Sequence, residues 1–210
     1  MTRIIWKEGK VISIRTRGEN YVLAQMGIEP YLIIFKLFSK DDKWVKIRLD
    51  SKYVLFSHPV TRQFLKKSTI NEQKHIDPLK DFKLPTRWIK EDMSSRSVVI
   101  WPGTANQIEL ILFGEHGASL IEYDANKPGF QEEKIVMKTI SLDDVESIES
   151  HELRNISIYP EFNERLYLCS QFGENVDPYK DLLFGRDLPL DYKKYFQIIS
   201  GTVPLSELGY

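Results

Sequence analysis

Short runs of apolar and β-branched residues, closely spaced between turn residues, are the feature that most restricts how this chain folds. They recur along residues 10–57, where Gly27, Pro30 and the polar stretch 39–42 separate them. Short runs of this kind, bounded by Gly, Pro, Asp or Ser, predict β-strands. We therefore expect five strands, at residues 10–15, 20–27, 30–38, 43–49 and 52–57. Strands this close in sequence favour a small curled antiparallel sheet or SH3-like barrel.

The first two runs give a hairpin signal with a cation-rich turn. Residues 6–26 read WKEGKVISIRTRGENYVLAQM, and a polar stretch containing Gly and Asn separates the two apolar segments. Arg15 and Arg17 lie in the turn, Lys7 and Lys10 precede it, and two aromatic residues flank them. Cations interleaved with aromatics are typical of nucleic-acid surfaces. Cations on a sheet edge also block unwanted strand pairing. We favour the second interpretation, in which the hairpin supports the sheet.

The rest of the chain mixes strands with helices. A helix is expected at 60–67, and residues 68–96 read as either a linker or an arm packed on the sheet. Further strands are expected at 97–101, 107–113, 118–123, 133–140, 154–159 and 165–170. Helices are expected at 142–150, at 190–200, and from an N-cap at Asp177 to Gly185. Ser141 is the expected start of the 142–150 helix, and Gly201 the expected stop of the last one.

These elements predict an α+β fold that is mainly β. A small SH3-like or curled antiparallel sheet at the N-terminus is followed by a mixed α+β unit. We divide the chain into a basic β-barrel-like domain at 1–90 and an acidic α+β domain at 91–210, with one continuous domain as the alternative.

Composition restricts the compartment and the chemistry. Cys169 is the single cysteine, so no internal disulfide forms, and we expect it to be a small buried residue in a strand. No window reaches 18 apolar residues, and residues 1–20 show no secretory signal. A soluble cytoplasmic protein without a membrane partner is expected.

No catalytic or metal motif stands out. His58, His75, His116 and His151 are scattered, and none has a second histidine at ligand spacing. The adjacent carboxylates at 132–133 and 143–144 point to opposite sides of a strand. We expect no catalytic residues, no metal and no cofactor, and an enzyme with a dispersed site is the least supported class.

Charge divides the chain and points to a partner surface. Residues 1–100 hold 20 Lys and Arg against 11 Asp and Glu, whereas residues 101–210 hold 9 against 19. The carboxylates are densest at 141–164. A helix at 142–150 places Asp143, Glu146 and Glu149 at three-residue spacing on one face. Val145, Ile148 and Leu153 then point to the core. Aromatic residues nearby would anchor the partner. The expected partner-binding residues are Asp143, Asp144, Glu146, Glu149, Glu152, Tyr159, Glu161, Phe162 and Glu164.

Part of the chain resembles a known family. The pattern comprises Trp6, Gly9, Val11, Ile14 and Gly18, the runs 21–24 and 33–38, and more loosely 54–56 and 87–89. Across residues 6–90 it is similar to immunity-protein family 26. Members of that family are small, mainly β proteins encoded beside bacterial polymorphic or contact-dependent toxins. The resemblance implies that the protein neutralises a cognate toxin domain by binding it.

Two functions follow, in order of preference. The first is an immunity protein that binds a toxin domain, expected to be a nuclease, in a 1:1 complex that covers its active site. Carboxylates presented to an electropositive nuclease cleft would speed association. The alternative is an RNA- or DNA-binding module that uses the basic N-terminal barrel.

Overall fold

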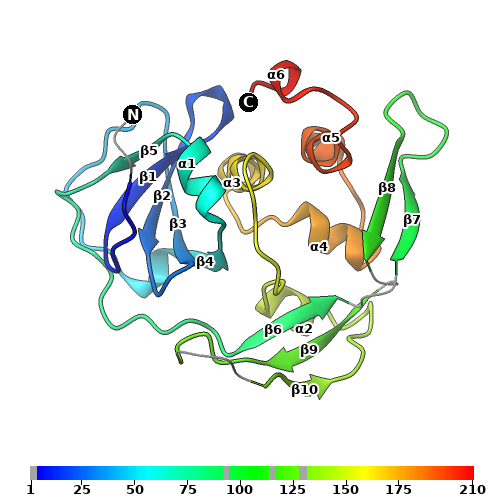
Figure 1. Cartoon of the computed structure of the whole chain (residues 1–210), viewed down its shortest axis with the longest axis horizontal. Coiled ribbons are helices and arrows are strands. Elements are labelled where there is room, and N and C mark those ends of the chain that lie inside the picture. Colours follow the sequence, from blue (N-terminus) through cyan, green and yellow to red (C-terminus); the bar gives the residue numbers. More distant parts are fainter. Residues whose placement is uncertain (1–3, 92–94, 114–116, 128–131) are drawn as a thin grey trace. The chain divides into compact units, whose positions relative to one another are not determined.

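The structure is a computed structural model that describes residues 4–91, 95–113, 117–127 and 132–210. The chain forms two compact units, each built from two separate stretches (Figure 1). Unit 1 comprises Met1–Lys83 and Ile156–Val176, and unit 2 comprises Leu84–Asn155 and Asp177–Tyr210. This differs from a division at residue 90, because a late segment returns to the first unit.

The fold class is α+β with more strand than helix, as the sequence predicts. Strands make up 29% of the residues and helices 26%. Among the described residues, none of the helices combines the length and the apolar character that crossing a membrane requires.

Unit 1 is built on an antiparallel sheet of five strands in the order β4-β3-β2-β1-β5. Its strands are β1 (Val11–Arg15), β2 (Tyr21–Met26), β3 (Tyr31–Ser39), β4 (Val54–Pro59) and β5 (Ile70–Glu72). The predicted hairpin is confirmed, with Val11 opposite Gln25 and Arg15 opposite Tyr21. Gly18 has φ +65° in its turn, a left-handed conformation that favours glycine.

Both faces of this sheet are covered, which explains why its strands are apolar in succession rather than in alternation. One face carries Val11, Leu23 and Phe35, packed with the aromatic residues Trp44 and Phe82 of the connecting segments. On the other side of the sheet lie α1 (Arg62–Lys67) and α3 (Glu161–Phe172) (Figure 1).

The predicted strand at 43–49 is wrong. This segment is irregular, and its apolar residues Trp44, Ile47 and Leu49 pack on the sheet instead of pairing with it. The fifth strand is β5, which pairs with β1. Residues 68–82 are therefore a packed arm, and the Gln25 side chain holds them further by bonding both the N–H and the carbonyl of Leu79.

The predicted strands at 154–159 and 165–170 are also wrong. The first contains only an isolated bridge between Ser157 and Val60, and the second lies inside the helix α3. Residues 162–166, 168 and 169 of this helix are all buried, so its helical periodicity is hidden in the sequence. Cys169 is buried as expected, but in a helix.

Unit 2 contains a three-stranded sheet in the order β10-β9-β6 and a separate β7-β8 hairpin. Its strands are β6 (Arg87–Glu91), β7 (Ser95–Ile100), β8 (Ile108–Phe113), β9 (Ala118–Glu122) and β10 (Lys134–Met137). Its helices are α2 (Val145–Ser150), α4 (Pro178–Leu183), α5 (Lys193–Ser200) and α6 (Leu205–Leu208). The core joins Ile89 and Leu120 of the sheet to Ile148 of α2 and Leu183 of α4.

Two of the helices confirm their predicted caps. The Asp177 side chain accepts a hydrogen bond from the Lys180 N–H, and Pro178 is the first residue of α4. At the end of α5, Gly201 has φ +65°. This helix packs against β8 and buries Tyr195 and Phe196.

Candidate protein-docking surface

The helix α2 carries the main part of the predicted acidic surface, but it begins later than expected. The Asp144 carboxylate, not Ser141, is its N-cap and accepts from the Ser147 N–H at 3.0 Å. Hydrogen bonds from Ser147 hold the pKa of Asp144 below its ordinary value. The Asp144 N–H bonds the Ser141 carbonyl, so Ser141 opens a turn that precedes the helix.

The core of unit 2 holds α2 in place. Ile148 is fully buried, whereas Val145, expected to point inward, is 57% exposed. The buried ammonium of Lys180 donates to the carbonyls of Ile148 and His151 at 3.0 and 3.2 Å. These carbonyls lie at the helix C-terminus, where no backbone N–H follows to satisfy them.

Three exposed carboxylates remain around α2. Asp143 precedes the helix, and Glu146 and Glu149 lie on it. The three are not equivalent, because Glu149 forms an ion pair with Arg186, which also lies 3.4 Å from Asp181. Glu152 is buried, and its carbonyl accepts from the Ile89 N–H. The accessible acidic surface of unit 2 is therefore smaller than the sequence suggests.

The other four predicted residues belong to unit 1, and two of them are buried in its core. Phe162 is fully buried, stacks on His58 with ring centres 5.3 Å apart and meets Phe64 edge-on. Glu164 is also fully buried. Tyr159 and Glu161 are half-buried, and burial raises the pKa of Tyr159. Phe162 and Glu164 are thus packing residues, because neither offers surface to a partner.

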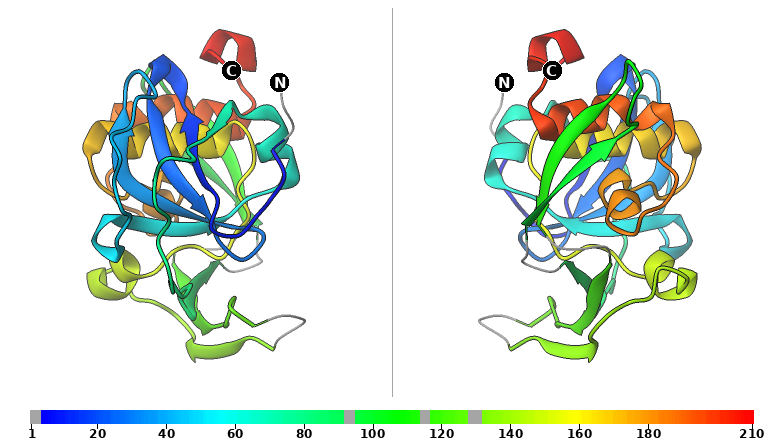
Figure 2. Two further views of the ribbon diagram at one scale, coloured as in Figure 1. Left: turned by 90° about the vertical axis from the view of Figure 1, so that its left-hand side faces the viewer. Right: turned by 90° about the vertical axis from the view of Figure 1, so that its right-hand side faces the viewer.

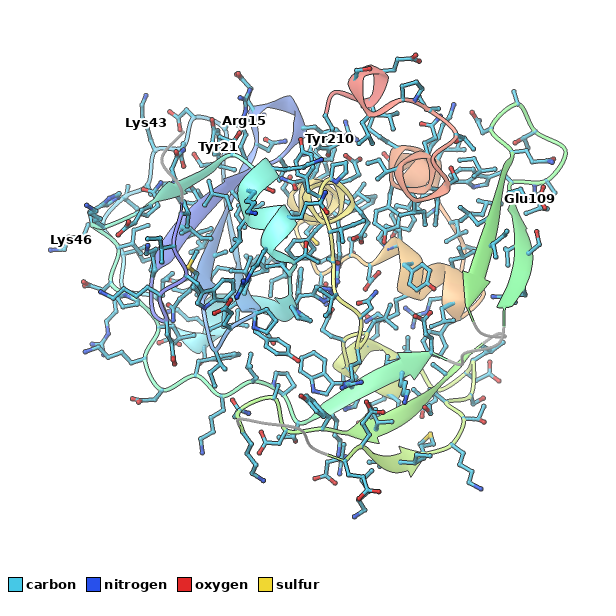
Figure 3. All side chains as sticks on the ribbon, in the orientation of Figure 1. Arg15, Tyr21, Lys43, Lys46, Glu109 and Tyr210 are labelled. Atoms are coloured by element: carbon cyan, nitrogen blue, oxygen red, sulfur yellow. The ribbon has the colours of Figure 1, made fainter. Side chains whose placement is uncertain are left out.

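The cations of the first hairpin have partners within unit 1. The Nε of Arg17 lies 2.9 Å from both carboxylate oxygens of Glu164, and its guanidinium stacks on Tyr167. Arg15, which projects beside Tyr21 in Figure 3, pairs with Glu19 at 3.1 Å. The Lys10 ammonium donates to the Ile5 carbonyl. These contacts support the interpretation that the hairpin is a scaffold.

Sequence reasoning missed an exposed apolar edge in unit 2. The strand β10 is the outer member of its sheet and pairs only with β9 among the described strands. In both views of Figure 2 it is the yellow-green strand at the bottom. Ile135, Val136 and Met137 are 58%, 41% and 36% exposed. The unpaired backbone N–H and C=O groups of an edge strand form a template for another strand, and exposed apolar side chains favour such an association. The signal was the sequence KIVMK, in which lysines flank the apolar run on both sides.

An ionic cluster lies at the base of β10. Glu133 contacts Lys90 at 2.6 Å and also pairs with Arg154, whose guanidinium lies over the Tyr123 ring. The hydrogen bond from Lys90 is the main reason that the pKa of Glu133 lies below its ordinary value. This pairing fixes the start of the strand. We define the docking surface of unit 2 by two groups of exposed residues: Ile135–Met137 on β10, and Leu142, Asp143, Val145, Glu146 and Glu149 at α2.

The described residues contain no group of three or more His, Cys, Asp or Glu side chains placed to hold a metal ion. His58 and Ser157 form a hydrogen bond of 3.0 Å, but both side chains are buried. His75 bonds the Trp44 carbonyl and His151 bonds the Ser147 carbonyl. His116 lies outside the described residues.

A comparison with known families places the chain. A family model described as "Domain of unknown function (DUF8309)" matches residues 1–187. The chain belongs to this family. No curated protein and no solved structure matches it. The matched region includes all of unit 1 and most of unit 2, so both units are part of the same family domain.

Proposed function

We propose that the protein is an immunity factor that binds and neutralises a cognate bacterial toxin domain in the cytoplasm. It acts by forming a 1:1 complex, without turnover and without a cofactor. The docking surface of unit 2 carries this proposal, because it combines an exposed apolar strand edge with exposed carboxylates. The resemblance of residues 6–90 to immunity-protein family 26 supports the class of partner.

The chemistry of the surface favours a nuclease as the toxin. A nuclease cleft is electropositive, since it holds phosphate groups. Asp143 and Glu146 are exposed, and they would lie against such a cleft where nucleic acid otherwise binds. Charge complementarity of this kind mainly raises the association rate and makes it sensitive to salt. The exposed apolar residues Leu142 and Val145, next to these carboxylates in the sequence, would supply the desolvated contacts that slow dissociation.

The test uses the toxin domain encoded by the reading frame adjacent to this gene. We expect coexpression of the protein to rescue cells from that toxin, and the purified pair to form a 1:1 complex. The variant D143K/E146K should associate about tenfold more slowly at low salt, show a weaker dependence on salt and protect cells less.

The matched control is E8K/E19K, which changes the net charge equally on exposed residues of unit 1. It should associate and protect like the wild-type protein. Normal association of D143K/E146K would show that the acidic residues are only solvated surface. Catalytic inactivation of the toxin by substoichiometric protein would instead assign the protein to the enzymes.

A further inference from the structure

A groove of about 960 Å³ lies in unit 1, beside the short outer strand of the five-stranded sheet. Its volume lies within the range of about 300–1,000 Å³ that is typical of ligand sites. Four parts of the chain line it: the segment 4–10, Glu29, the helix α1, and residues 68–72, which include β5.

The groove meets β5 along its edge. Thr69, Ile70, Asn71 and Glu72 all line it, although successive side chains of a strand point to opposite faces of the sheet. Only a space that follows the strand edge reaches four consecutive residues. In the order of the sheet, β5 is outermost, and among the described strands it pairs only with β1.

On the side of the groove, β5 has backbone N–H and C=O groups that are not used in its pairing with β1. The Thr69 carbonyl and the Gln73 N–H bond β1, and Asn71 between them lies opposite Ser13. Backbone groups alternate in direction along an antiparallel strand. The N–H and C=O groups of Ile70 and Glu72 therefore point away from β1, in the direction an added strand would need.

The side chains around the groove define the ligand. Ile5, Trp6 and Leu65 give it apolar walls, and Ile5 is 71% exposed. Arg62 and Lys66 are exposed on α1, and the Arg62 guanidinium lies 3.8 Å from the Glu29 carboxylate. Carboxylates on the ligand would suit these cations.

We infer that this groove binds an extended peptide segment of a partner protein, which adds a strand to β5. The peptide alternates apolar side chains, which fill the groove, with at least one carboxylate directed at Arg62 and Lys66. Main-chain hydrogen bonds to Ile70 and Glu72 give affinity, and the side chains give specificity. A peptide fits better than a nucleic acid because Glu29 and Glu72 also line the groove and would repel the successive phosphates of a nucleic acid, whereas the peptide needs only a carboxylate placed at Arg62 and Lys66.

The experiment selects random linear peptides, displayed on phage, on the full-length protein. We expect enriched peptides to alternate apolar and polar residues and to contain Asp or Glu. The variant E72P removes an outward N–H without removing a bond to β1, a substitution that edge strands accept. E72P should bind the enriched peptides with about tenfold lower affinity than the wild type. The matched control E72Q keeps the N–H, loses the charge, and should bind like the wild type.

A second pair of variants tests the charge. R62E/K66E should also bind the enriched peptides about tenfold less tightly, whereas K43E/K46E, with the same charge change on exposed lysines, should not. The inference fails if selection on the wild-type protein enriches no peptide relative to selection on immobilised E72P. It also fails if the enriched peptides bind E72P and the wild type equally well. It also fails if oligouridine RNA binds the groove and displaces them. No groove residue belongs to the docking surface of unit 2, so the toxin proposal is tested separately.

Discussion

At the scale of single residues, the ion pair of Arg17 and Glu164 shows how the same side chains suit two opposite interpretations. In the sequence, Arg17 belongs to a cationic turn and Glu164 to an acidic segment 147 residues away. In the structure, Glu164 is fully buried and Arg17 is 27% exposed. A buried carboxylate requires a charged or hydrogen-bonding partner. Local pattern could not show this, because the contact depends on the return of α3 to unit 1.

Replacing Arg17 by Met should therefore destabilise unit 1. The variant leaves the Glu164 carboxylate buried without its guanidinium, and we expect a loss of about 3 kcal/mol in the free energy of unfolding. The matched control R15M removes the exposed pair with Glu19 in the same turn and should cost about 0.5 kcal/mol or less. Urea unfolding followed by tryptophan fluorescence measures both. Equal effects of the two variants would contradict a structural role for Arg17.

Glu91 provides a pH-dependent test in unit 2. Burial raises the pKa of this carboxyl above its ordinary value of 4.5, although the Tyr179 hydroxyl donates to it at 2.6 Å and acts in the opposite direction. The folded state thus favours the neutral form. The protonated Glu91 carboxyl therefore contributes fully to stability below the ordinary pKa of 4.5. This contribution is lost as the pH rises through the raised pKa.

E91Q should consequently unfold at a higher temperature than the wild type near neutral pH. The neutral amide has no charge to desolvate, and its oxygen still accepts from Tyr179. The difference should disappear as the pH falls below 4.5, where the wild-type carboxyl is also neutral. Melting curves over this range measure it. A difference that does not change with pH would show that the effect is not due to titration.

At the scale of the elements, local sequence signals predicted the elements whose contacts join residues close in the sequence. The β1–β2 hairpin follows from its apolar runs and its glycine, and α4 follows from Asp177 and Pro178. The helix α3 could not be predicted in this way, because its buried residues leave no polar stripe to show the helical period. For the candidate docking surface, the exposure of Asp143, Glu146 and Glu149 agrees with the sequence, whereas the exposed apolar edge of β10 depends on sheet order; a role of either in binding stays a prediction.

The position of α2 depends on one buried lysine. In K180M, the carbonyls of Ile148 and His151 lose their ammonium donor while the apolar stem is retained. We expect a loss of about 2 kcal/mol in the free energy of unfolding, and faster amide exchange along α2. The control K127M alters an ammonium whose side chain is 71% exposed and should change little. Unchanged exchange in α2 would show that its C-terminus is held by other contacts.

At the scale of the whole molecule, neither unit is a continuous stretch of sequence. The chain passes from one unit to the other three times, after residues 83, 155 and 176. Composition suggested a boundary near residue 90, because charge changes there. The return of α3 had no compositional signal, since its acidic residues resemble those of the segment before it.

Residues 1–83 alone should therefore not fold cooperatively. They lack α3, whose Phe162 packs on Phe56 and Phe64 and whose Asn163 bonds Ser68. Adding a synthetic peptide of residues 156–176 should restore a cooperative thermal transition. The same peptide with F162S should bind about a hundredfold more weakly. Cooperative unfolding of the fragment 1–83 alone would show that α3 is dispensable.

The interrupted order of unit 1 has a consequence for synthesis on the ribosome. The five strands of its sheet emerge first, but the helix that covers one face is translated only after residues 84–155. During that interval, the nascent chain carries apolar side chains such as Ile12, Val22 and Ile34 that α3 will later help to bury. Such surfaces are bound by chaperones or aggregate. Unit 1 thus completes its fold only once residues 156–176 have emerged from the ribosome, although most of its sequence is made before that of unit 2.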